Sequence, residues 1–163
     1  MISPIRLVLF VILVFASSSP VWSATCLTTL PPNPPFEPPQ PQSKMPLGNR
    51  FWHGTKELWT ILPVGGTLRG LPIYNSETKG YREKVFWWRE GYDILAEPKP
   101  KLVVTGRRLD AEGSFAISNA TNAASSDIGS AMLTGVDFPA YGCWEVTGHY
   151  NGHTLSFVVS VEP

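Results

Sequence analysis

The chain has 163 residues, and its 13 Lys and Arg residues balance its 13 Asp and Glu residues. The basic residues are scattered, with Arg107 and Arg108 as the one adjacent pair. Because nothing in this pattern would neutralise a run of phosphates, nucleic acid is not an expected partner. The length suits a single domain after removal of a leader.

Residues 1–23 have the layout of an export signal peptide. Arg6 precedes an unbroken apolar run at 7–16, and small residues lead to Ala24, where we expect the mature chain to begin. The apolar run is too short for a membrane span, which takes roughly 20 residues. We therefore expect a secreted or periplasmic protein that meets the membrane only transiently, during export.

Cys26 and Cys143 are the two cysteines of the chain. In an oxidising compartment a disulfide between them is the simplest interpretation, with two separate thiols as the alternative. A lipoprotein is a further alternative, in which cleavage directly before Cys26 allows lipid attachment. It fits less well, because such sites favour a Leu-like residue and a Gly or Ala where this chain has Ser23 and Thr25.

Proline dominates the N-terminal segment 24–47, which precedes the expected domain. Seven of the eleven residues at 31–41 are proline, which fixes φ and removes the backbone donor. We expect 31–41 to run as an extended, semi-rigid strap. The strap could be a free linker, or it could dock on the domain if Cys26 is bonded to Cys143.

Residues 48–163 predict an all-β domain. Short apolar or alternating runs are separated by Gly, Pro, Asn and Asp, a spacing typical of an antiparallel β-sandwich. The stretch 120–126, rich in Ala and Ser, is expected to be a loop. The expected strands are 58–62, 67–73, 84–89, 102–109, 114–118, 131–138, 143–150 and 153–161.

The last two of these strands are predicted to form a hairpin. Asn151 and Gly152 tolerate the positive φ of a type I′ turn. With these residues as the turn, one face of the hairpin is apolar and the other is polar. The pairs predicted on the apolar face are Tyr150 with His153, Gly148 with Leu155, Val146 with Phe157, and Trp144 with Val159.

Cys143 falls on the polar face of this hairpin by the same alternation. A bond to Cys26 would then hold the strap across the outside of the sheet or at its end.

The segment Gly-Cys-Trp-Glu-Val at 142–146 resembles the entry to the penultimate strand of immunoglobulin-like domains. The resemblance puts Trp144 in the place of the corner tyrosine and Val146 in that of the core cysteine, so the inter-sheet disulfide of that family is absent. Trp87 and Trp88 resemble the tryptophan-bearing strand C. The resemblance implies an immunoglobulin-like antiparallel β-sandwich.

The chain as a whole resembles a set of uncharacterised secreted bacterial proteins. The shared layout is a Cys soon after the signal peptide, W-T at 59–60, F-W-W-R at 86–89, G-R-R-L-D at 106–110 and a closing G-C-W-E-V-T-G at 142–148. The resemblance covers nearly the whole mature chain. It implies export, the cysteine pair and the sandwich, and it implies no activity.

The sequence predicts no catalytic, cofactor or metal site. His149 and His153 flank the hairpin turn, but on strands they point to opposite faces, so a shared metal is not expected. His53 is interpreted as a loop histidine. Glu145 and Asp137 are the acids considered for glycoside hydrolysis, but the chain has no cleft-forming insertion to house them.

Trp87 and Trp88 are the candidate ligand-contacting residues. Because they are adjacent on an expected strand, one must face outward, where it could stack against a sugar ring or be covered by the strap. Arg82 and Arg89 could bind carboxylates or remain solvated at a sheet edge. We therefore expect a non-catalytic exported module that binds a protein or associates with the envelope. The alternative is binding of an envelope glycan through exposed aromatics.

Overall fold

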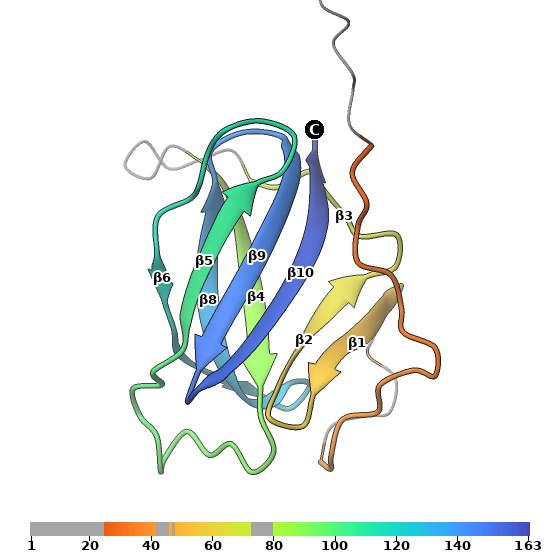
Figure 1. Cartoon of the computed structure of the whole chain (residues 1–163). Coiled ribbons are helices and arrows are strands. Elements are labelled where there is room, and N and C mark those ends of the chain that lie inside the picture. The colour runs from red at the N-terminus through yellow and green to blue at the C-terminus, as the bar shows by residue number, and fades with distance from the viewer. Residues whose placement is uncertain (1–24, 42–45, 47, 73–79) are drawn as a thin grey trace, which may run out of the picture.

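The computed structural model describes residues 25–41, 46, 48–72 and 80–163, and the predicted signal peptide at 1–23 lies outside them. Two five-stranded sheets pack face to face (Figure 1). The first sheet has the order β1 (Arg50–Thr55), β2 (Leu58–Pro63), β4 (Tyr81–Trp88), β8 (Gly129–Phe138) and β7 (Thr121–Ser125). The second has the order β3 (Thr67–Arg69), β10 (His153–Glu162), β9 (Gly142–Tyr150), β5 (Val103–Arg108) and β6 (Ser118–Asn119).

The pairing within both sheets is antiparallel, except that β3 lies parallel to β10. The described part of the chain contains no helix, so the predicted all-β sandwich is confirmed.

The structure contains two strands that the sequence did not predict. β1 precedes the first expected run, and β7 occupies most of the stretch expected to be a loop. Ala and Ser have little preference for strands, but β8 offers a free edge that pairs with all five residues of β7. The loop prediction was therefore wrong because tertiary pairing outweighed composition.

Two expected strands are shorter than predicted. β3 ends at Arg69, before Gly70 with its positive φ of 61°, and residue 73 lies outside the described residues. The run at 114–118 forms one bridge at Ser114 and supplies Ser118 to β6, and between these points Phe115 turns into the core. Phe115 fits there because Gly106 faces it, and a Cβ on Gly106 would lie 1.9 Å from the Phe115 ring.

The β9–β10 hairpin has the predicted register. Asn151 and Gly152 have positive φ angles of 47° and 82°, and the four predicted pairs are all present. Except for Leu155 and His153 near the turn, the residues of the apolar face are buried between the sheets. The predicted separation into an apolar and a polar face is confirmed.

The position of the Trp87–Trp88 strand corrects one part of the immunoglobulin resemblance. In immunoglobulin-like domains strand C pairs with the penultimate strand. Here β5 pairs with β9, whereas β4, which carries Trp87 and Trp88, pairs with β2 and β8 in the other sheet. Strands rich in aromatic residues occur in either sheet of a sandwich, so the tryptophan pair does not show to which sheet its strand belongs.

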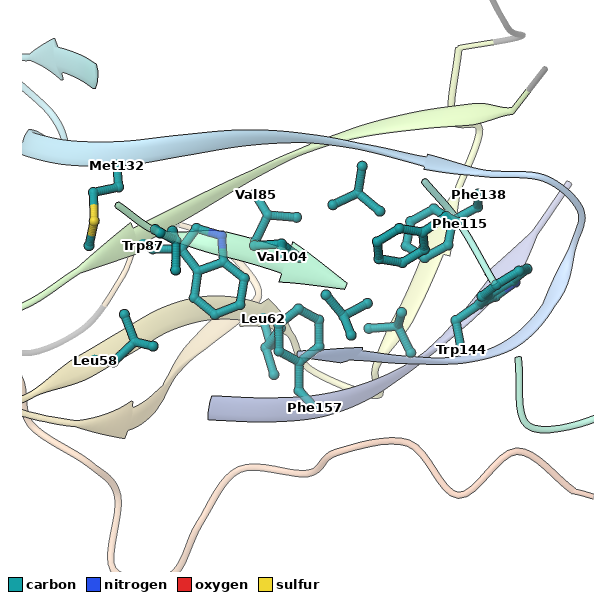
Figure 2. Close-up of a cluster of buried hydrophobic side chains, with 14 of the residues drawn as sticks. Leu58, Leu62, Val85, Trp87, Val104, Phe115, Met132, Phe138, Trp144 and Phe157 are labelled. Carbon is teal, nitrogen blue, oxygen red and sulfur yellow. The ribbon is translucent and has the colours of Figure 1, made fainter. Parts of the chain in front are cut away.

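The core fills the space between the two sheets, and Figure 2 shows Trp87 of the first sheet facing Phe157 of the second. Their ring centroids are 5.8 Å apart. Trp87 also donates a hydrogen bond from Nε1 to Thr134 Oγ1 at 3.0 Å, which satisfies its polar atom in an apolar setting.

Gly148 leaves room for Trp87 from the opposite sheet. A Cβ at position 148 would lie 2.6 Å from Cζ3 of Trp87, whose side chain is fully buried. Since the packed core cannot yield by that much, we expect Gly148→Ala to lower the free energy of unfolding by about 1–3 kcal/mol.

Urea denaturation would measure this loss. Gly135→Ala is the matched control, because Gly135 is exposed and a Cβ there would meet nothing closer than Arg82 Nε at 3.8 Å. Equal losses for the two variants would contradict the packing explanation.

Candidate functional site

A disulfide joins Cys26 to Cys143, as the sequence predicts. It leaves Cys26 without a free thiol for lipid. Cys143 pairs with Ser160 on the face of β9 that points away from the core residues Trp144 and Val159, so its predicted place on the outer face is confirmed. The bond is compatible with an oxidising compartment.

Backbone bonds continue the attachment beyond the disulfide. The N–H of Thr29 donates to the carbonyl of Val158 at 2.9 Å, and the N–H of Val158 donates to Thr29 Oγ1 at 2.8 Å. Val158 belongs to the part of β10 that lies beyond its pairing with β3. The segment before the strap therefore covers a free strand edge, which would otherwise be a site for unwanted pairing.

His53 covers the same free edge of β10, two residues before Val158. It lies in β1, not in a loop as predicted, and its Nε2 is 3.1 Å from the carbonyl oxygen of Ser156. Gly66 completes the series, because its carbonyl accepts a hydrogen bond from the N–H of Ser160 at 2.9 Å.

The strap then passes to the first sheet, beside β1 and β2 (Figure 1). Phe36 contacts Trp59 of β2 at a centroid distance of 6.1 Å, and Pro38 is buried. Of the two arrangements that the sequence left open, the structure has the docked strap.

Both candidate ligand-contacting tryptophans are buried. Trp87 has 0% of its surface exposed and faces the core, and Trp88 faces outward but is only 2% exposed. Trp88 packs edge-on against Trp52 at 5.3 Å and donates from Nε1 to the carbonyl of Ile128 at 3.0 Å. Of the two possibilities that the sequence left open for the outward-facing tryptophan, stacking against a ligand or burial under a cover, the structure has the buried one.

This covered layer is the outer aromatic cluster, which consists of Trp52, Trp59, Trp88 and Ala131. Phe36 of the strap is among the side chains packed against it. The side chains alternate along β2 and β4, so the same strands supply the core on one side and this cluster on the other.

A polar network ties the hairpin turn to the loop after β4. Arg89 Nε donates to the Tyr150 hydroxyl at 2.9 Å, and this hydroxyl donates to Glu97 Oε2 at 2.5 Å. The Tyr92 hydroxyl donates to Asn122 Oδ1, and burial raises the pKa of Tyr92 to about 12. Arg89 is thus bound within the protein, and the network has a structural role.

The acids considered for hydrolysis are far from forming a pair. Asp137 lies in the first sheet, where Arg82 binds both its oxygens at 2.7 Å. Glu145 lies in the second sheet and pairs with Arg107 at 2.7 Å. Each carboxylate is held by its own arginine on a different sheet, so the two do not flank a common position.

The two hairpin histidines are separated as predicted. His153 pairs with Tyr150 and His149 pairs with Thr154, and alternation sends their side chains to opposite faces. Among the residues that the structure describes, no three His, Cys, Asp or Glu side chains are grouped as metal ligands would be. These residues also include no helix long and apolar enough to span a membrane.

An open groove separates β2 from β4. The two strands pair at only two positions, Trp59 with Trp88 and Thr60 with Trp87, before β2 diverges towards the second sheet. The groove between them has a volume of about 230 Å³. Its apolar lining includes Leu62, Leu68, Leu71, Val85 and Phe157, and its charged lining includes Arg50, Arg69, Glu83 and Lys84.

Glu83 is the distinctive residue of the groove. It is in phase with Val85 and Trp87 and pairs with the buried Val136, so its side chain is on the core side of β4. The other acids of the described strands, Asp137, Glu145 and Glu162, each pair with an arginine. Glu83 has no hydrogen-bond or ion-pair partner among the described residues.

Desolvation raises the pKa of the Glu83 carboxyl above its ordinary value, and the charge of nearby Arg50 opposes this shift. A perturbed acid in an apolar groove is a feature typical of binding sites. Glu83 is not among the residues predicted from the sequence, although the alternation of 81–88 places this acid in phase with two apolar residues, Val85 and Trp87.

In comparisons with known proteins, no family model, curated protein or solved structure matches the chain.

The disulfide should make a large contribution to stability. The bond closes a loop with a sequence separation of 117, and the chain-entropy model gives an upper limit of about 5 kcal/mol for such a loop. We expect the Cys26→Ser, Cys143→Ser double variant to lose about 2–5 kcal/mol in urea denaturation. A reducing agent should destabilise the wild type equally and leave the variant unchanged. A double variant as stable as the oxidised wild type would contradict the prediction.

Glu83 should make stability depend on pH in a recognisable direction. Its raised pKa means that the native state holds the proton to a higher pH than the unfolded chain, so stability decreases as the pH rises from about 4.5 through the native pKa. We expect Glu83→Gln to be more stable than wild type at neutral pH, with the difference disappearing below the unfolded pKa.

Chemical denaturation across pH 3–8 measures this difference. Asp110→Asn is a control of opposite sign, because a hydrogen bond from Arg108 lowers the pKa of Asp110. That variant should be the less stable one at neutral pH, with its deficit shrinking as the pH falls. A Glu83→Gln variant that is less stable at neutral pH would show that the carboxylate has a native partner.

Proposed function

We propose that this protein is an exported, non-catalytic β-sandwich module that binds an extended segment of a partner protein in the groove between β2 and β4. The observation that carries the proposal is the early separation of these strands, which leaves a groove where the Glu83 carboxylate has no partner among the residues that the structure describes. The oxidising compartment that the Cys26–Cys143 bond requires supports secretion or a periplasmic location.

The connectivity supports a sandwich of immunoglobulin-like type. The chain leaves the first sheet after β2 and continues as β3, which lies parallel to the last strand, β10. Trp144 donates from Nε1 to the carbonyl of Ala140 at 3.0 Å, which corresponds to the corner bond that tyrosine makes in that family. Val146, in the place of the core cysteine, is fully buried.

The shape of the groove favours an extended segment. Its two walls are the strands β2 and β4. Where these strands diverge, a side chain joins them, because Thr60 Oγ1 of β2 donates a hydrogen bond to the Phe86 carbonyl of β4 at 2.7 Å. A strand laid between such walls can place alternate side chains towards Leu68 and Phe157.

Charge favours a partner with a basic side chain. Glu83 has no ion-pair partner among the described residues, although three basic residues also line the groove. Arg69 is already neutralised by Glu162 at 2.8 Å. Lys84 alternates to the other face of β4, and Arg50 acts on Glu83 through its charge without forming an ion pair. The aliphatic stem of a lysine could lie along the apolar lining while its ammonium group reaches Glu83.

Carbohydrate binding, the alternative from the sequence, has no support at Trp87 and Trp88, because sugar stacking requires an accessible aromatic face and both rings are buried. The proposal therefore favours the protein partner.

A photo-crosslinking amino acid at Lys84, on the groove, tests the proposal in the secreting cell. The matched control is the same substitution at Lys99, an exposed lysine in the loop after β4. We expect crosslinks to an extended partner segment at position 84 only, and we expect Leu68→Trp, which fills the groove, to abolish them. Crosslinks that are identical at both positions, or that survive Leu68→Trp in a folded protein, would overturn the proposal.

A further inference from the structure

The outer aromatic cluster presents three tryptophans on the side of the first sheet that faces away from the core. Trp52, Trp59 and Trp88 are 7%, 1% and 2% exposed, although no third sheet covers them. Their burial depends in part on the strap, in which Phe36 packs against Trp59 and the nearby Pro38 is itself buried. Without this cover the sheet would present a continuous aromatic face.

The part of the strap that covers the tryptophans is separate in sequence from the residues that attach the N-terminal segment to the second sheet. The disulfide at Cys26 and the bonds of Thr29 hold the chain at β9 and β10. The residues between these points and Phe36 are largely exposed, and Leu30 is 65% exposed. Phe36 and Pro38 can therefore leave the aromatic face while the disulfide and the bonds at Val158 remain intact.

Trp59 shows that the strap is an incomplete occupant of this face. Its Nε1 is buried and has no hydrogen-bond acceptor within the described part of the chain. By contrast, the indole N–H groups of Trp87 and Trp88 each donate to an acceptor at 3.0 Å. A buried donor without an acceptor is rare and costly, and a ligand that supplies a carbonyl would remove that cost.

A hollow at the end of the strap also remains unfilled. It has a volume of about 120 Å³ and is lined by Gln40, Pro41, Trp59, Trp88 and Ser130, together with residues 89–92. The strap thus leaves both space and an unmet hydrogen-bond donor beside the cluster.

We infer that the outer aromatic cluster is a binding site for an extended, proline-rich segment of a partner protein, and that the strap occupies this site in the free protein. The occupant's chemistry follows from the strap itself, in which seven of eleven residues are proline. Proline rings pack on aromatic side chains, and the carbonyls of a proline-rich segment lack local donors. One such carbonyl accepts the hydrogen bond of Trp59 Nε1.

Nuclear magnetic resonance of the indole N–H groups tests this inference directly. The probe is a synthetic peptide with the sequence of residues 30–41, and the control peptide replaces its prolines with alanine. Phe36→Ala and, as a second variant, Pro38→Ala weaken the cover without changing the aromatic face. The Trp59 resonance is identified by its loss in Trp59→Phe, and Trp87 in the core is the internal reference.

We expect the proline-rich peptide to move the Trp59 resonance downfield and to leave that of Trp87 unchanged. Binding to the cover variants should be about tenfold tighter than to the wild type, because the competing strap is weakened. Adding Trp59→Phe, which keeps a ring but removes the donor, should weaken binding about fivefold. Trp88→Phe is the matched control, since its N–H is already bonded to Ile128.

Two results would overturn the inference. One is a Trp59 resonance that does not move at millimolar peptide, either in the wild type or in those of the Phe36→Ala and Pro38→Ala variants that are folded. The other is equal binding of the alanine peptide, which would mean that the face does not select proline. Neither result decides whether the groove binds a partner, because crosslinking at Lys84 tests the groove separately.

Discussion

The fixed register of the β9–β10 hairpin is the constraint on which the rest of the structure depends. The turn at Asn151 and Gly152 sets which side chains face each other, and one register places Trp144, Val146, Phe157 and Val159 in the core. A slip of one residue would turn all of these towards solvent. The same register sends Cys143 outward, where the disulfide to Cys26 can form. The path of the N-terminal segment across the outside of the sandwich is therefore a consequence of a two-residue turn more than a hundred residues away.

A second requirement follows from the short pairing between β3 and β10. β3 covers only the last part of β10, from Ser160 onward, so the preceding part has an open edge. Two unrelated groups cover that edge, the His53 ring at Ser156 and Thr29 at Val158, and the Gly66 carbonyl bonds to Ser160 where the pairing with β3 begins. The N-terminal segment thus completes a sheet as well as covering a face. Such an edge, if exposed, would risk pairing with other chains.

The sequence predicts those parts of the fold that local chemistry determines. The hairpin register, the cysteine pair and the all-β class follow from turn residues, alternation and compartment. It failed where tertiary contacts decide, since β7 forms because β8 has a free edge. Alternation shows that one of Trp87 and Trp88 faces outward, but the burial of Trp88 depends on Trp52 and Ile128, which come from other parts of the chain. Glu83 was visible as an acid in the apolar phase of β4, but its lack of a partner depends on where β2 leaves that strand. The orphan donor of Trp59 depends on the path of the strap, which no local pattern encodes.

The groove and the outer aromatic cluster are physically connected, because Ile61 and Phe86 line the groove and also pack against the cluster. β2 and β4 are joined by two residue pairs, and one of these pairs, Trp59 with Trp88, is also half of the aromatic cluster. Packing of Phe36 on Trp59 therefore supports the only backbone pairing that closes one end of the groove. A segment that binds the cluster more completely than the strap would strengthen this pairing, and loss of all cover would weaken it. The width of the groove and the occupancy of the aromatic face are thus expected to change together, because both depend on how firmly two residues of β2 are held against β4.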